Sequence, residues 1–272
     1  MNSMLNEKAT ARATTIQLLK DTVDEKNWIE NSLTINNIRN EINNHQLFNH
    51  NIISSLNNGE FDLEKIQKIH LEYKNAIVEI FTDALLAAQW SAKELDQLFE
   101  PTVKMYARFL LSFNISDEFG LVANTNYEIS PLNSHFCLYR NVLEQLNISE
   151  EMIKTYKHSE ESSILRATLE NSYTSYCDIV LLLAIAEMQV IKFSAPLKKS
   201  LSHLNIDTNY GYYNVHGTTI DADLNAADDE HEDDLWILLN QVSHFSQPDK
   251  IKAKALEYCD SWNKFWSKMN DI

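Results

Sequence analysis

Apolar residues recur at helical spacing along most of the chain. A stripe of apolar positions predicts a long amphipathic helix over about residues 62–88, which begins at Asp62. Ser91 and Glu94 have the spacing of a capping box, in which each side chain accepts a hydrogen bond from the backbone N–H of the other residue. They predict the start of a second helix, which continues to about residue 113.

The same spacing continues through the second half of the chain. Pro131 suits the first turn of a helix, because its missing N–H would have no partner there. Ser149 is a suitable cap for a short helix, and Pro196 is expected to end a long apolar one. The helices predicted in this half are 131–146, 149–158, 160–193, 222–245 and 251–269.

Two segments near the N-terminus differ in pattern. Residues 1–12 are polar, and we expect them to form a flexible, frayed N-terminus. The segment 31–58 is rich in Asn but retains apolar residues at near-helical spacing, which indicates a packed helix and not a tail. These apolar residues are Ile35, Ile38, Ile42, Leu47 and Phe48.

The pattern as a whole predicts an all-α bundle of about seven helices. No strand alternation and no repeat period is visible in the sequence. Four Gly and four Pro are too few for a fold made of many tight turns. Because no linker rich in Gly, Ser or Pro divides the chain, we expect one bundle domain over residues 13–272.

Composition restricts the class of partner. The chain carries 23 basic and 39 acidic residues, a net charge of −16, so nucleic acid and anionic membranes would be repelled. The longest apolar run, 179–186, is much shorter than the roughly 20 residues of a membrane span. The three Cys have no CxxC spacing, which is typical of reduced thiols. We therefore expect a soluble cytoplasmic protein with no nucleic-acid or membrane partner.

Glu187 lies in the most apolar part of the sequence, IVLLLAIAEMQVI. This segment is apolar on nearly every side and is expected at the centre of the bundle. A carboxylate buried there loses its hydration unless a cation, a metal ion or hydrogen-bond donors replace the water. Glu187 is therefore either one partner of a buried ion pair with Lys or Arg, or a metal ligand.

Residues 221–234 hold eight acidic residues around His231. Asp228 and His231 are three positions apart, which places both on one face of a helix and suits two ligands of one metal ion. His216 lies upstream and would share that face if the helix were continuous. The alternative is a solvated acidic face with an incidental histidine.

The same segment also has features of a calcium-binding EF-hand loop. Ala226 stands where the sharp turn of that loop requires Gly, and Asp228 stands where an apolar residue is usual. The sequence offers no second loop to pair with it, so calcium is the weaker alternative. The residues at positions 1, 3, 5, 9 and 12 of the loop would be Asp221, Asp223, Asn225, Asp229 and Glu232.

Glu118 and His135 form a third group of polar candidates. Glu118 ends an apolar helix just before Gly120, and His135 lies near the start of the next helix. Each residue alone is typical of an exposed helix end. Ferritin-like di-iron proteins use a Glu-x-x-His pair on each of two helices, and the sequence contains no such pair. Any metal site in this chain must therefore have a different layout.

Five segments, taken in order, carry a resemblance to a known superfamily. They are HQLFNHNIISSLNNGEF at 45–61, NISDEFG at 114–120, SHFCLYRNVLEQLNI at 134–148, AIAEMQVIKF at 184–193, and YYNVHG with DDEH within 212–231. The chain resembles the heme-oxygenase-like di-iron oxidases over about residues 45–245. This superfamily shares a seven-helix bundle with heme oxygenase, the TenA thiaminases and the PqqC-like proteins. The chain is most similar to the group that contains the chlamydial death-domain-associating protein.

The resemblance implies a set of metal ligands. In the family, two irons are bound by a Glu and a His from neighbouring helices, a Glu from the long central helix, and a His-x3-Asp-x2-His cluster. The resemblance carries these roles to Glu118, His135 and Glu187, and it carries the opening His of the cluster to His216.

The rest of the cluster departs from the family pattern. Ile220 and Asp223 stand where an Asp and a His are expected. Asp228 and His231 supply that pair only if about eight residues are inserted. Asp221 or Asp223 could then replace Asp228 as the last carboxylate ligand. The departure from the family pattern therefore falls on the second iron site.

These expectations define a function. The resemblance implies a non-heme di-iron oxidase or oxygenase, in which two Fe(II) ions, or manganese, activate O2. The substrate would be an amine, an amino acid, a fatty acid, or one of the protein's own side chains. Glu118 and Glu187 would be catalytic as well as ligands. Three carboxylates and three imidazoles suit iron or manganese and nearly neutralise two such ions. A homodimer is a further expectation from the fold.

Other functions are open to the same fold. A metal-free TenA-like hydrolase would need a Cys nucleophile, and neither Cys137 nor Cys177 has a recognisable TenA context. A PqqC-like enzyme would need a basic pocket, which the acidic composition disfavours. The non-enzymatic alternative is a helical interaction protein that keeps the bundle without iron. Metal content distinguishes it from the oxidase.

Overall fold

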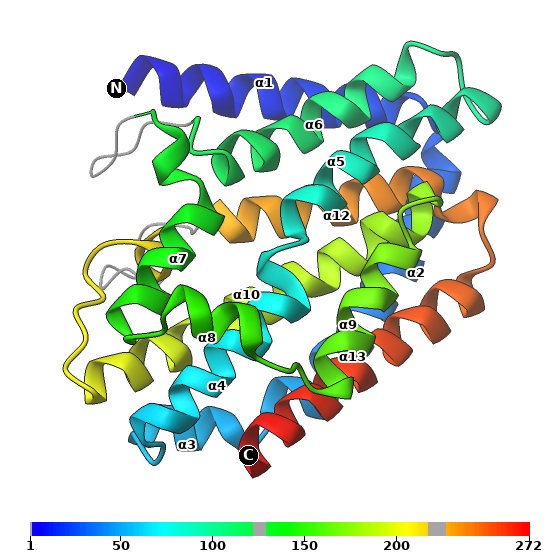
Figure 1. Cartoon of the computed structure of the whole chain (residues 1–272). Coiled ribbons are helices and arrows are strands. Elements are labelled where there is room, and N and C mark those ends of the chain that lie inside the picture. The colour runs from blue at the N-terminus through cyan, green and yellow to red at the C-terminus, as the bar shows by residue number, and fades with distance from the viewer. Residues whose placement is uncertain (1, 122–128, 217–226) are drawn as a thin grey trace.

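The computed structural model describes residues 2–121, 129–216 and 227–272. Over these residues the chain forms helices joined by short connections and contains no strand (Figure 1). This confirms the all-α class. The described helices are more numerous than the seven that we predict, because several of the predicted helices are interrupted.

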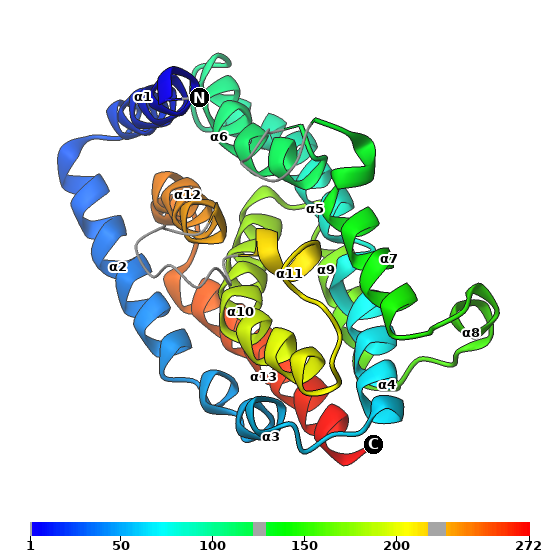
Figure 2. The same ribbon diagram turned by 90° about the vertical axis from the view of Figure 1, so that its left-hand side faces the viewer.

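Helix α10 (Tyr176–His203) runs through the middle of the molecule (Figure 2). Every residue from 179 to 190 is buried, which explains why this segment is apolar on all sides. Helices α12 (Ala227–Val242), α3 (Ile52–Asn58), α5 (Phe81–Ser91) and α13 (Pro248–Asp271) pack against it. Helix α10 is long and apolar enough to cross a membrane, but 83% of its most apolar window is buried inside the protein. It is therefore the core helix of the bundle.

Helix α12 is enclosed by the N-terminal half of the chain. Helices α1 (Asn2–Asp21), α2 (Glu25–Asn43) and α6 (Val103–Glu118) all contact it. We expected residues 1–12 to be frayed, but α1 is helical from Asn2. Its Lys8 and Arg12 form ion pairs with Asp117 and Asp234, and these contacts hold the first helix against α6 and α12.

The predicted helix over 62–88 is interrupted in its middle. Helix α4 (Leu63–Tyr73) begins as predicted, with the Asp62 side chain accepting a hydrogen bond from the Lys65 N–H. A π-helical turn, η2 (Lys74–Val78), then separates α4 from α5. The turn is held by partners on other segments, including the hydrogen bond from Asn75 Nδ2 to the Ser162 hydroxyl, 2.9 Å long. Helical spacing alone cannot reveal such a turn.

The predicted capping box at Ser91 is wrong. The Ser91 hydroxyl donates to the Tyr173 carbonyl at 2.8 Å, and the Glu94 carboxylate accepts from the Tyr176 N–H at 3.1 Å. Both side chains therefore hold the loop before α10 and do not cap a helix of their own. The short 3₁₀ helix η3 (Ala92–Gln97) follows α5, and α6 begins only after Pro101.

The predicted helix 160–193 is two helices. Helix α9 (Glu160–Asn171) is followed by a turn, after which Ser175 caps α10 by accepting a hydrogen bond from the Asp178 N–H. The predicted stop at Pro196 is also wrong, because α10 continues through this buried residue to His203. The packing around α10 compensates for the backbone hydrogen bond that proline removes.

The remaining elements are short except for the closing helix. Ser149 caps α8 (Glu150–Thr155) as predicted. Pro131 begins a 3₁₀ turn, and the α-helix that we expected there starts later, at His135. The other short elements are η1 (Gln46–Asn49), η4 (Pro131–Asn133), α7 (His135–Gln145), α11 (Tyr212–Val215) and η5 (Ser243–Phe245). The predicted closing helix is α13, and four of its aromatic side chains lie in the core: Tyr258, Trp262, Phe265 and Trp266.

Candidate metal centre

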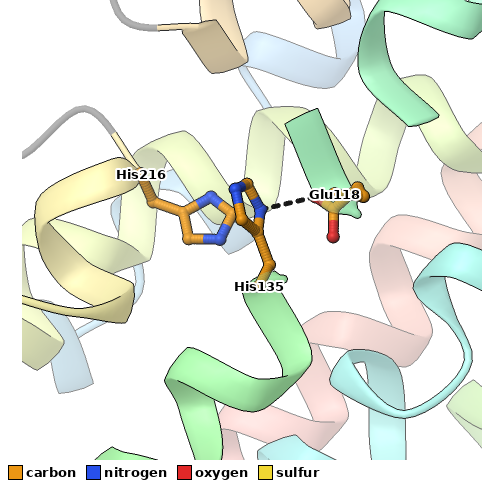
Figure 3. A group of neighbouring side chains, drawn as sticks. All are labelled: Glu118, His135 and His216. Carbon is orange, nitrogen blue, oxygen red and sulfur yellow. Dashed lines mark hydrogen bonds and ion pairs between the residues drawn. The ribbon is translucent and has the colours of Figure 1, made fainter. Parts of the chain in front are cut away.

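Glu118, His135 and His216 converge on one point inside the bundle (Figure 3). One possible ligand atom from each of them lies within 4.8 Å of the others. The three side chains come from the end of α6, the start of α7 and the residue after α11. They are 6%, 8% and 5% exposed, so they do not lie at the surface as isolated helix-end residues would.

The turn after α6 brings Glu118 to His135. Gly120 has a φ of 68°, the left-handed conformation that glycine adopts without strain. A Cβ at this residue would lie 2.7 Å from the Ser130 carbonyl oxygen and 2.8 Å from the Ser134 nitrogen. Only glycine therefore permits the end of α6 to pack directly on the turn that begins α7. As a result, His135 Nδ1 lies 2.8 Å from Glu118 Oε1.

His216 completes the group from the opposite side. Its ring centroid lies 4.6 Å from that of His135, with the planes at 71°. The Tyr212 ring also packs against it, with the centroids 4.2 Å apart. Helix α11 contacts α7, so the short helix fixes the position of His216 relative to His135.

Glu187 lies beside the group on the central helix. Its side chain is buried, and its Oε1 accepts a 2.7 Å hydrogen bond from Asn114 Nδ2. Among the described residues, the Oδ1 atom of Asn114 is buried without a hydrogen-bond partner. The prediction that Glu187 is central and buried is confirmed. Asn114 provides part of the replacement for its lost hydration.

A small cavity joins these side chains. Glu118, His135, Glu187 and His216 all line it, and it leaves about 20 Å³ for the centre of a water-sized sphere. That space is enough for an ion or one or two small molecules, but not for a larger organic substrate. The rest of the wall is formed by Ile77, Val78, Phe81, Phe136, Val190 and Tyr212. Two of these residues come from the π-helical turn η2.

His231 has a different partner. It is buried on α12, and its Nε2 lies 2.8 Å from Asp117 Oδ2. Burial raises the pKa of Asp117, but the hydrogen bonds and charges of His231 and Lys8 together hold this pKa below its ordinary value. His231 therefore contacts Asp117, the residue that precedes Glu118. Its ring does not belong to the group formed by Glu118, His135 and His216.

The alternatives for the last carboxylate ligand are Asp221, Asp223 and Asp228. Asp221 and Asp223 lie outside the described residues, and so does the side chain of Asp228, although its backbone belongs to α12. Of the residues considered for a calcium loop, the carboxylate of Glu232 is described. It accepts a hydrogen bond from Trp236 Nε1 and forms an ion pair with Arg39.

Two residues of this region were missed by the sequence analysis. Asn114 and Glu118 are four apart and therefore share a face of α6, which is the signal that could have revealed Asn114. Asp117 precedes Glu118 and binds His231 from a neighbouring face of the helix. Its role depends on where α12 packs, and no spacing within the sequence shows that contact.

Comparison with solved structures identifies the architecture. The chain superposes on the crystal structure of a TenA homolog from Pseudomonas syringae pv. tomato str. DC3000 with a TM-score of 0.60 and 13% identity. The match covers 89% of this chain and 92% of that chain. This chain has a TenA-like fold. At this identity the likeness establishes the fold alone, and the predicted TenA-type bundle is confirmed. No protein-family model and no curated protein matches the sequence.

Neither cysteine considered for a TenA-like nucleophile lies in the cavity wall. Cys137 is partly buried on α7, and Cys177 is partly buried at the start of α10, beside the Ser246 hydroxyl at 3.6 Å. Burial raises the pKa of the Cys177 thiol and so disfavours the thiolate, which is the nucleophilic form. The geometry therefore favours the Glu and His group as the chemical site.

A cluster of buried tyrosines adjoins the centre. Tyr212 contacts Tyr139 and Tyr213, with ring centroids 4.8 and 5.2 Å apart. His70 lies among these rings, and burial lowers its pKa from 6.5 to about 4, although its hydrogen bond to the Ile66 carbonyl acts in the opposite direction. His70 is therefore a neutral imidazole at pH 7.

His70 should make the fold sensitive to acid. The unfolded chain protonates this histidine below about pH 6.5, whereas the folded chain resists protonation until about pH 4. Stability is therefore lost as pH falls through this window, by about 3 kcal/mol at 1.36 kcal/mol per pKa unit. Urea unfolding at several pH values measures the free energy of unfolding of the wild type and of His70→Gln. The difference between the two proteins in the slope of this free energy against pH is the contribution of His70.

The comparison with the variant is necessary because another group titrates in the same range. Burial raises the pKa of Asp234 to about 6, which acts in the opposite direction and is present in both proteins. If wild type and His70→Gln lose stability in parallel between pH 6.5 and 4, His70 does not have this role.

Proposed function

We propose that the protein is a non-heme iron oxidase that uses O2, with Glu118, His135 and His216 as ligands of one iron. The observation that supports this proposal is the donor set. Two imidazoles and one carboxylate that converge on one position are the ligands of the non-heme Fe(II) oxygenases, and the set leaves coordination positions open. Structural zinc sites differ because they are usually closed by four protein ligands.

The surroundings of the three ligands also suit a metal ion. Glu118 and Glu187 are two buried carboxylates that line one largely apolar cavity. Removing two such charges from water is costly, and a divalent cation between them would compensate both. The free space in the cavity is of the right order for an ion with a small molecule bound to it.

The side chains of the protein would bind the metal ion, orient its ligands and shield the cavity from water. Iron, when bound, supplies the one-electron chemistry with O2 that the amino acids lack. Asn114 orients Glu187 through its hydrogen bond. Phe81, Phe136 and Tyr212 line the cavity and exclude bulk water, which strengthens every electrostatic interaction inside it.

A second iron is part of the proposal, with Glu187 and His231 as its ligands. His231 would have to exchange Asp117 for the ion, and Asp228, Asp221 or Asp223 would provide the last carboxylate. The substrate would be a side chain of the protein, or a small amine, amino acid or fatty acid, for which the cavity would have to widen beyond its present free space. A cytoplasmic location and a homodimer also belong to this proposal.

The test is an anaerobic titration of metal-free protein with Fe(II), followed by addition of O2. We expect tight binding of iron and stoichiometric O2 consumption with oxidation of the iron, and binding of a second ion if His231 contributes. Absence of iron binding would contradict the oxidase and favour the helical interaction protein. Iron binding without O2 consumption would limit the proposal to a metal-binding protein.

A further inference from the structure

Tyr213 and His70 form a hydrogen-bonded pair inside the tyrosine cluster. The Tyr213 hydroxyl lies 3.0 Å from His70 Nε2, and both side chains are fully enclosed. On the other side of the imidazole ring, His70 Nδ1 lies 2.8 Å from the Ile66 carbonyl oxygen. The ring is thus fixed between a phenol and a backbone carbonyl.

These contacts determine where the protons are. A carbonyl oxygen only accepts hydrogen bonds, so the Nδ1 atom of His70 carries the hydrogen. In a neutral imidazole the other nitrogen is then an acceptor, and the phenol of Tyr213 donates to it. The low pKa of His70 is consistent with this neutral state. The pair consists of a phenol and a preformed acceptor for its proton.

The pair is also connected to the candidate metal centre. The Tyr213 ring lies at 5.2 Å from Tyr212, whose ring lies at 4.2 Å from His216. Burial raises the pKa values of Tyr139, Tyr212 and Tyr213 well above 10, so none of these phenols ionises at neutral pH. Such a phenol can lose an electron readily only if its proton leaves at the same time.

We propose that Tyr213 is a redox-active residue that forms a neutral tyrosyl radical, with His70 as the acceptor of its proton. A one-electron oxidant takes one electron from the Tyr213 side chain. The O–H bond of the phenol breaks, and its proton forms an N–H bond at His70 Nε2. The products are the neutral radical of Tyr213, the imidazolium of His70 and the reduced oxidant. Reduction reverses every step.

Under the proposed function, the oxidant would be oxidised iron at the Glu118, His135 and His216 centre, and only this physiological role rests on that function. Tyr213 would supply an electron to the site through Tyr212, and the proton would stay inside the protein. Two other phenols of the interior, buried Tyr139 and partly buried Tyr173, are less suited to this role. Tyr139 donates to the His70 carbonyl and Tyr173 to the Ile80 carbonyl, and neither acceptor is a base.

The experiment uses metal-free protein and a photogenerated ruthenium(III) tris-bipyridine complex as the one-electron oxidant. Flash photolysis with optical and EPR detection is expected to show a long-lived neutral tyrosyl radical in the wild type, formed more slowly in D2O. Tyr213→Phe should lose the long-lived component. His70→Gln keeps an oxygen acceptor without a basic nitrogen, and it should also lose this component.

The matched control is Tyr210→Phe, because Tyr210 is an exposed phenol (69%) three residues away. It should lose only short-lived surface signal. Circular dichroism establishes that each variant is folded, and Tyr213→Phe removes a single oxygen atom, so the test does not depend on His70→Gln. A long-lived radical that persists in folded Tyr213→Phe would overturn the proposal. The photolysis uses metal-free protein, so its outcome is independent of the Fe(II) titration. A radical in the photolysis with no iron binding in the titration would reject the oxidase alone. Iron binding with no radical would reject this inference alone.

Discussion

His216→Ala is expected to weaken Fe(II) binding by at least about 100-fold, because loss of an outer hydrogen-bond partner alone typically costs about 10–100-fold. The substitution removes one of two imidazoles from the group and leaves the Glu118 to His135 contact in place. It also removes the ring that packs against His135 and Tyr212. Anaerobic equilibrium dialysis against Fe(II) measures the change directly.

The control for this variant is His203→Ala. His203 is exposed on the last turn of α10, where its Nε2 lies 3.0 Å from the Asn57 carbonyl oxygen. The variant loses an imidazole and one hydrogen bond, and neither His203 nor Asn57 belongs to the cavity wall, so iron affinity should be unchanged. Equal affinities of wild type and His216→Ala would show that iron, if bound, is held elsewhere.

Trp266→Ala is expected to lower the free energy of unfolding by about 3–5 kcal/mol. Trp266 is fully buried on α13 and stacks on Phe193 of α10, with the ring centroids 4.3 Å apart and the planes at 1°. It also contacts Tyr73 and Phe265. The substitution would leave a cavity between the closing helix and the core helix. Urea denaturation measures the loss as a shift of the midpoint, with the slope of the free energy of unfolding against urea concentration unchanged.

Trp266→Phe separates packing from hydrogen bonding. Among the described residues, the Trp266 indole nitrogen has no hydrogen-bond partner, so its removal costs nothing in hydrogen bonding. The phenylalanine ring preserves most of the stack on Phe193, and we expect less than half of the loss seen for alanine. A loss below about 1 kcal/mol for Trp266→Ala would mean that the core around α13 relaxes into the vacated space.

Local signals predicted a large part of the fold. Ser149 caps the helix that it was expected to cap, and the helix expected to begin at Asp62 does so, since the capping hydrogen bond in each joins residues three apart. Ser91 was misassigned, because its hydroxyl and Glu94 bind the loop before α10. The π-helical turn at 74–78 was missed for the same reason. Both features depend on partners that are distant in the sequence.

Less of the candidate site than of the fold could be predicted from the sequence. The burial of Glu187 could be predicted, because the segment around it is apolar on every side. The proximity of Glu118 to His135 was expected only from the family resemblance, and it results from a turn that Gly120 alone permits. The contact between Asp117 and His231 joins α6 to α12, and no pattern within either helix indicates it.

The most direct test of the account is anomalous X-ray diffraction at the iron edge, from crystals loaded anaerobically with Fe(II). We predict a peak between Glu118, His135 and His216, with ligand atoms at about 2.0–2.2 Å, the range for nitrogen and carboxylate oxygen on a transition metal. A fully loaded crystal with no iron among these three side chains, or with iron only at surface carboxylates, would contradict the central claim that this buried group is a metal centre.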